Sequence, residues 1–420
     1  MSIRAEATAR PGPPNLYRWL VLAFVSLAMF GNYYIFDAMN PVGPFLESQL
    51  KFRQSQIGLL DSAYNVAALI ILLLGGIIID RAGTKRAMIL FGIITALGGL
   101  LIALAPGLYW GMMAGRFVLG LGAEPLIVAI TTALAKWFKG KELSLAMGLN
   151  LTIARLGSVA ADNSRSWAGG LFTSWQPPLF LAAGIGVVCI VSGLVYAWFE
   201  RRAERQYTLG RGGAVDKLVF ADLVRFGLKY WWIVGLCVTF YSVVFPFRRF
   251  ANIFFQQARG LSPEKAAFLN GLLPLTAMVA TPLFGILADK IGKRALLMAI
   301  GSILLLPTFL LLAYTDLPVA IPMAFLGAAF SLVPAVMWPA VTYLVHETRL
   351  GTAYALMTFC QQIGWASTSW GLGRLNDTFK ASAANPAGFN PGLLLLSGLG
   401  LAGLVFSWLL WRTERAKQPA

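Results

Sequence analysis

Long apolar segments are the feature of this sequence that most constrains its fold. Segments 57–79 and 179–199 both exceed the roughly 18 residues that a helix needs to cross a hydrocarbon core about 30 Å thick. Backbone polar groups in lipid have to be satisfied within such a segment, and these runs lack the alternation of barrel strands. Charged residues make up only 12% of the chain, against about 25% in typical soluble domains. The sequence therefore predicts an all-α membrane protein.

The apolar segments predict twelve transmembrane helices in two groups of six. Their expected positions are 19–43, 56–79, 87–106, 108–135, 143–171, 178–199, 230–257, 265–288, 295–314, 318–345, 350–377 and 392–411. The longest hydrophilic stretch separates the two groups. The predicted organisation is a tail at 1–18, a six-helix bundle at 19–199, a linker at 200–229, a second six-helix bundle at 230–411 and a tail at 412–420.

The distribution of basic residues predicts the orientation. With both termini on one side, 23 Lys and Arg lie in the tails, linker and loops of that side, and 5 lie in loops of the other. Positive residues favour the cytoplasmic face, so we expect both termini there, in a bacterial inner membrane. The net charge of +16 suits loops that face anionic lipid, and no nucleic-acid partner is expected.

A repeated loop motif indicates two related halves. One copy contains Gly76, Asp80, Arg81, Gly83, Lys85 and Arg86, and the other contains Gly285, Asp289, Lys290, Gly292 and Arg294. The pattern resembles the loop signature of the major facilitator superfamily. That resemblance implies two pseudo-symmetric bundles of six helices and a cytoplasmic latch that steadies one access state. Arg116, in a second similar motif at 115–123, joins the predicted gating residues. A plain positively charged turn is the alternative interpretation of the loops.

Charged residues inside the predicted spans mark the candidate site. They are Asp37, Arg116, Glu124, Arg155, Asp162, Arg165, Arg248 and Arg249. Each costs about 2.5–3.5 kcal/mol at the centre of an isolated membrane helix, so we expect these charges to pair or to face water. Asp61, near the start of the second span, is interpreted as a residue at the water-facing rim.

Glu124 and Arg155 form the centre of the predicted site. At 1.5 Å per residue, both fall near the middle of the membrane. A carboxylate accepts an ammonium group and an arginine holds a carboxylate at two points, so the two residues suit a zwitterion. The alternative is an internal Glu124–Arg155 bridge that locks two helices together.

A closer family resemblance is carried by segments 137–143, 148–149, 154–158, 244–247 and 350–354. They are similar to the lysosomal dipeptide uniporter family (major facilitator superfamily domain-containing protein one) and its bacterial relatives. The resemblance implies that Asp37, Glu124 and Arg155 belong to a peptide pathway, with Glu124 and Arg155 holding the peptide termini. Asp162, Arg165, Arg248 and Arg249 depart from the family pattern. The two added arginines either select an anionic solute or pair with Asp37 and Asp162.

The other predicted binding residues are aromatic or polar. Tyr34, Tyr241 and Trp338 are expected to line the cavity, and Gln362 stands where the repeat places Arg155 in the first half.

No cofactor, metal ligand set or catalytic triad is predicted, so we expect a transporter and not an enzyme. The expected activity is alternating-access transport of a dipeptide or other small zwitterion, by uniport or with a coupled ion. An anion transporter is the alternative, followed by a non-transporting receptor or scaffold. We expect a monomer in the lipid bilayer.

Overall fold

The structure is a computed structural model that describes residues 12–138, 142–209, 226–346 and 349–415. The predicted tails and linker lie partly outside these ranges. Within them, the chain is a set of long helices joined by short connections, and a lone β-bridge joins Ser382 to Asn385. The predicted all-α architecture is confirmed.

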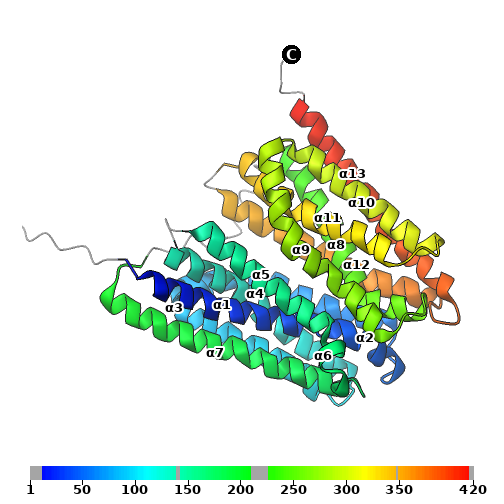
Figure 1. The fold of residues 1–420 in the computed structure, drawn as a ribbon, viewed down its shortest axis with the longest axis horizontal. Coiled ribbons are helices and arrows are strands. Elements are labelled where there is room, and N and C mark those ends of the chain that lie inside the picture. Colours follow the sequence, from blue (N-terminus) through cyan, green and yellow to red (C-terminus); the bar gives the residue numbers. More distant parts are fainter. Residues whose placement is uncertain (1–11, 139–141, 210–225, 347–348, 416–420) are drawn as a thin grey trace, which may run out of the picture.

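The helices form two bundles that follow each other along the chain (Figure 1). The N-terminal bundle comprises α1 (Asn15–Asp37), α2 (Met39–Ser48), α3 (Gln54–Leu104), α4 (Tyr109–Phe138), α5 (Leu143–Asp162), α6 (Ser164–Trp167) and α7 (Gln176–Gln206). The C-terminal bundle comprises α8 (Leu228–Gln257), α9 (Pro263–Ile291), α10 (Arg294–Tyr314), α11 (Ala320–Ala340), α12 (Leu350–Thr378) and α13 (Asn390–Arg415). Short 3₁₀ turns occur at Gly169–Leu171, Val341–Tyr343 and Pro386–Phe389.

Eleven helical segments of the described chain are long and apolar enough to cross a membrane. The long helix α12, rich in polar residues, is not among them but occupies the place of the eleventh predicted span. Helix α3 contains both the second and third predicted spans, joined through a kink at Gly83, where φ is 77°. The fifth predicted span was too long, because its helix ends at Asp162 and short turns follow.

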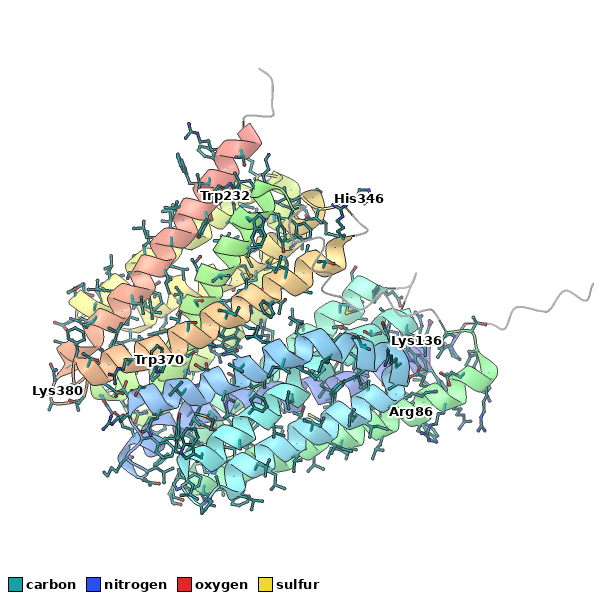
Figure 2. All side chains as sticks on the ribbon, turned by 180° about the vertical axis from the view of Figure 1, so that it is seen from behind. Arg86, Lys136, Trp232, His346, Trp370 and Lys380 are labelled. Atoms are coloured by element: carbon teal, nitrogen blue, oxygen red, sulfur yellow. The ribbon has the colours of Figure 1, made fainter. Side chains whose placement is uncertain are left out.

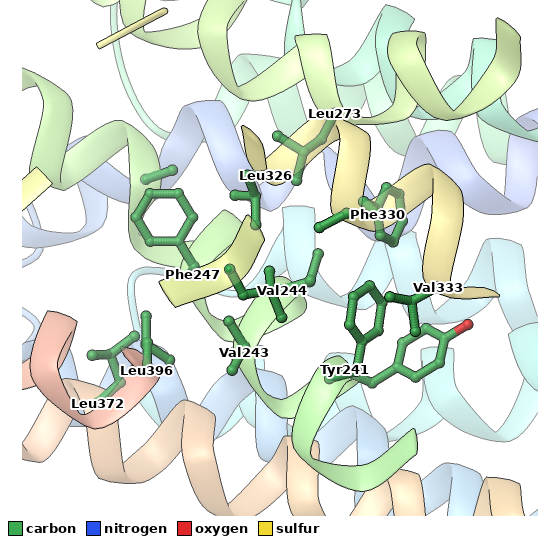
Figure 3. Close-up of a cluster of buried hydrophobic side chains, with 14 of the residues drawn as sticks. Tyr241, Val243, Val244, Phe247, Leu273, Leu326, Phe330, Val333, Leu372 and Leu396 are labelled. Atoms are coloured by element: carbon green, nitrogen blue, oxygen red, sulfur yellow. The ribbon is translucent and has the colours of Figure 1, made fainter. Parts of the chain in front are cut away.

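The interior of each bundle is apolar, and so is much of the outer surface. Figure 3 shows part of the C-terminal core, where Phe247 of α8 lies among side chains of α9 and α11. Large apolar side chains such as Leu283 and Val279 are 61% and 59% exposed. A soluble surface rarely presents so many exposed apolar groups together, whereas lipid accommodates them. The exposed apolar faces are those of an integral membrane protein.

The two bundles meet at one end and diverge at the other (Figures 1 and 2). Trp370 and Lys380 mark the closed end in Figure 2, and Arg86, Lys136 and His346 mark the diverging end, which we call the linker end. Contacts between the bundles run from α3 to α12, from α5 to α9 and from α2 to α8.

Contacts to main-chain atoms seal the closed end. The carboxylate of Asp377 on α12 accepts hydrogen bonds from the backbone N–H groups of Gln54 and Ser55, each at 2.9 Å. It thereby caps the first turn of α3, where N–H groups have no partner within the helix. At Gly58 the bundles approach so closely that a Cβ atom would lie 2.2 Å from the carbonyl oxygen of Ser369. Only glycine fits that contact without a shift of one bundle.

We predict that Gly58→Ala lowers the melting temperature of the purified protein, because the added methyl forces α3 and α12 apart at a cost of about 1–3 kcal/mol. Gly148→Ala is the matched control: this exposed glycine of α5 has no atom within 4 Å of the position of a Cβ. The control should melt at or above the wild-type temperature, since alanine favours helix over glycine. Equal melting of Gly58→Ala and wild type would contradict this account of the seal.

Candidate functional site

A cavity of about 200 Å³ lies between the two bundles. Its lining from the N-terminal bundle is Asn32, Tyr33, Phe36, Asp37, Tyr64, Glu124, Ile127 and Arg155, and its lining from the C-terminal bundle is Tyr241, Phe245, Arg248, Trp338, Thr358, Gln361, Gln362 and Trp365. A second cavity shares Glu124, Ile127 and Thr358 with the first and extends along Gly76 and Thr131. The second cavity therefore lies between the site and the linker end.

Glu124 and Arg155 share the first cavity without pairing with each other. Glu124 is on α4, and one of its carboxylate oxygens accepts a hydrogen bond from the Tyr64 hydroxyl at 2.8 Å. Arg155 is on α5, and its guanidinium lies over the rings of Tyr33 and Phe330, at 5.8 and 5.1 Å from their centroids. No described carboxylate lies within 4 Å of Arg155. The internal bridge considered as an alternative is thus not formed, and both charges remain available to a ligand.

The wall contributed by the C-terminal bundle is aromatic and uncharged apart from Arg248. Trp338 donates its indole N–H to the hydroxyl of Tyr241 at 2.9 Å. Phe245 stacks on Trp365 with ring centroids 4.1 Å apart. Gln362 is 3% exposed, and its carbonyl oxygen has no hydrogen-bond partner among the described residues. This wall offers ring faces and an open acceptor opposite the two charges.

Arg248 joins the bundles beside the cavity. Its guanidinium lies 3.3 Å from a carboxylate oxygen of Asp37 and 2.6 Å from one of Asp162. Asn40 donates to the same two carboxylates, at 3.2 Å to Asp37 and 2.8 Å to Asp162. Of the two interpretations of the added arginines, the structure supports pairing with acids for Arg248.

Arg249 enters a second network, centred on Asp61. One oxygen of Asp61 accepts from Arg249 and from Arg116, both at 2.8 Å. The other oxygen accepts from the Trp365 indole and the Ser369 hydroxyl of α12, at 2.8 and 2.9 Å. Asp61 is only 1% exposed, so its assignment to a water-facing rim was wrong. Its position inside a predicted span was the signal that it belonged with the other membrane charges.

The predicted binding residues divide into two groups. Asp37, Glu124, Arg155, Tyr241, Arg248, Trp338 and Gln362 line the cavity, whereas Tyr34, Asp162 and Arg249 do not. Tyr34 packs instead between the rings of Phe30 and Trp167, and Asp162 and Arg249 are occupied by the networks just described. The sequence reasoning missed four lining residues, Asn32, Ile127, Thr358 and Trp365. Trp365 was missed because its role depends on which face of α12 turns inward.

The repeated loop motif forms the two predicted turns at the linker end. Gly83 and Gly292 both have left-handed φ values, 77° and 68°, which glycine adopts at little cost. Lys85 pairs with Glu204 of its own bundle, and Arg294 pairs with Asp289 at 3.0 Å. The predicted gating residue Arg116 lies elsewhere, in the Asp61 network. The latch across the bundles stays a prediction, and these two pairs suit a state in which the bundles are apart at this end.

Comparisons with known proteins identify the family and the fold. The family described as Major Facilitator Superfamily matches residues 25–369. The chain is 34% identical over 382 residues to the lysosomal dipeptide transporter MFSD1 of Homo sapiens, covering 86% of this chain and 80% of that protein. It is 22% identical to the hexuronate transporter of Escherichia coli (strain K12), over 96% of both chains. Among solved structures, a bacterial homologue of the human lysosomal transporter Spinster, in an inward-facing and unoccupied conformation, superposes with a TM-score of 0.78 at 17% identity. The match covers 97% of this chain and 100% of that one.

We predict that Asp61→Asn destabilises the protein by about 3–5 kcal/mol, because it leaves Arg116 and Arg249 buried without a counter-charge. The matched control is Glu264→Gln, which removes the 3.0 Å ion pair with Arg165 between the same bundles, where Glu264 is 54% exposed. That pair is expected to contribute only about 0–1 kcal/mol. Thermal unfolding in detergent compares the two variants. Equal losses would mean that burial of the Asp61 network does not matter for stability.

Proposed function

The chain belongs to the Major Facilitator Superfamily of transporters, and we propose on that basis that it carries small zwitterionic solutes, dipeptides foremost, across the membrane by alternating access. Transporters of this kind hold their solute near the middle of the bilayer, between two halves that rock about it. The cavity between the two bundles of this chain is in the corresponding place.

One observation carries the proposal: Glu124 and Arg155 line one cavity and neither is neutralised by the other or by a third charged residue of the described chain. Separate charges of opposite sign in a membrane interior are costly. A ligand with an ammonium at one end and a carboxylate at the other removes both costs at once. The likeness to lysosomal dipeptide transporters supports a peptide as that ligand.

The proposed access state is inward-open. The cavity continues toward the linker end, and the positive-inside distribution of Lys and Arg places that end in the cytoplasm. The closed end then faces the outside, across an inner membrane in a bacterial cell. Return to the outward-open state requires the seal at Gly58 and Asp377 to separate.

An anionic solute has less support. Arg248 and Arg249, the residues that favoured it, are both paired with aspartates in this state. The likeness to a hexuronate transporter keeps sugar acids in the set of solutes worth testing.

Binding of modified dipeptides tests the assignment of the two charges. We predict that Arg155→Ala weakens binding of Ala-Ala by roughly 10-fold or more, since a hydrogen bond to a charged group contributes about 1.5–3 kcal/mol. The same variant should bind Ala-Ala amide as weakly as the wild type does, because the amide lacks the carboxylate. Glu124→Gln should show the converse pattern with N-acetyl-Ala-Ala. Isothermal titration calorimetry on purified protein measures each affinity.

Arg165→Gln is the control for removing an arginine outside the cavity and should bind all three ligands normally. Glucuronate and succinate are titrated alongside the peptides. The proposal fails if no dipeptide binds, or if Arg155→Ala lowers the melting temperature and the yield while leaving ligand preference unchanged.

A further inference from the structure

The second cavity, of about 230 Å³, meets the first along a shared wall. Glu124 and Ile127 of α4 and Thr358 of α12 line both cavities. Among the described residues, Tyr64 and Arg155 line the first cavity and not the second, and Tyr64 holds one oxygen of Glu124. Glu124 therefore lies at the boundary between the two cavities, with Arg155 on one side of that boundary.

The walls of the second cavity are mostly apolar. Glu124 is the one charged side chain in its described lining, and the hydroxyl of Thr131 is bound to its own helix, donating to the carbonyl of Val128 at 2.9 Å. Consecutive glycines, Gly75 and Gly76, leave room on α3. An unpaired charge in such surroundings is costly, whereas an apolar group is favoured. The aliphatic residues of the lining are Ile71, Leu72, Pro125, Ile127, Val128 and Ala355.

The covalent structure of a peptide determines which of its groups reaches the second cavity. The terminal ammonium and the first side chain are attached to the same carbon atom. With the ammonium on Glu124 and the terminal carboxylate on Arg155, the peptide backbone extends through the first cavity. The first side chain then begins at the boundary, and the second cavity is the space beside it that the backbone does not fill.

We propose that the second cavity is the pocket for the side chain of the first residue of the peptide, and that it selects uncharged aliphatic side chains such as that of leucine. The inference rests on the proposed function and narrows its substrate class. A leucine side chain buries three more carbon atoms than alanine does, and burial of apolar atoms favours binding. A lysine or glutamate side chain of similar length brings a charge that the aliphatic walls do not neutralise.

Isothermal titration calorimetry with matched dipeptides tests the pocket on the purified wild type. We expect Leu-Ala to bind about 10-fold more tightly than Ala-Ala, and also more tightly than Lys-Ala and Glu-Ala. If Leu-Ala binds no more tightly than Ala-Ala, the second cavity is an access route only and the inference is overturned, while the proposed function stands. If none of these dipeptides binds, the proposed function itself is overturned.

Val128→Phe fills the pocket from α4. Val128 is half-buried and lies one helical turn from Glu124, in the lining of the second cavity and outside that of the first. The variant should bind Leu-Ala no more tightly than Ala-Ala, while its affinities for Ala-Ala and Ala-Leu stay within about threefold of the wild type. Ala-Leu is the matched ligand, because it carries the same side chain on the second residue.

Val187→Phe is the matched control for the added ring. Val187 of α7 is 49% exposed on the outer face, so this variant should keep the preference for Leu-Ala. Retention of that preference in Val128→Phe contradicts the pocket, and so does an equal loss of affinity for Leu-Ala and Ala-Leu.

Val128→Ala covers the case in which Val128→Phe fails to fold. It widens the pocket and should raise the affinity for Phe-Ala relative to Leu-Ala by about threefold or more, because a larger side chain then fits between α3 and α4. An unchanged ratio of the two affinities would show that Val128 does not contact the first side chain, and would overturn the inference.

Discussion

Charge neutralisation in a low-dielectric interior is the constraint on which the rest of this structure depends. A charge held in a membrane has to find an opposite charge, a polar partner or water. The aspartates and arginines at the closed end solve this by pairing across the bundles, and this pairing ties the charge balance to the conformation. In the proposed function, a solute neutralises Glu124 and Arg155. The contacts of the closed end and the proposed binding site thus both follow from the need to neutralise buried charges.

The two bundles have diverged into different roles. The N-terminal bundle supplies Glu124 and Arg155, together with the three aspartates that pair with Arg248 and Arg249 at the closed end. The C-terminal bundle supplies an aromatic wall, the open acceptor of Gln362 and the two arginines that close the site. In the proposed function, a solute that touches both walls bridges the bundles, and the charges that select it stay on the N-terminal bundle. Movement between the bundles then changes access without dismantling the charged part of the site.

The closed end combines electrostatic and steric contacts, and both depend on the same approach of α3 to α12. Asp377 caps α3 from the other bundle, Gly58 permits main-chain contact, and Trp365 and Ser369 reach Asp61 from α12. Each contact is lost if the helices separate by a few ångströms. At the linker end, Lys85 and Arg294 pair within their own bundles.

The sequence by itself determined the class of protein: apolar segments long enough to span a bilayer, the break between two groups, the repeated loop motif and the membrane charges that define a polar path. These features are local, because a helix in lipid satisfies its own backbone and its composition reports its environment. Only the tertiary structure decided which charges pair. Asp61 was read as a rim residue, and Arg248 and Arg249 were left between two roles, because their partners lie on helices far away in the chain. Packing between helices decides which helix faces meet and at which end the bundles close. The order of residues along a single span does not encode that packing.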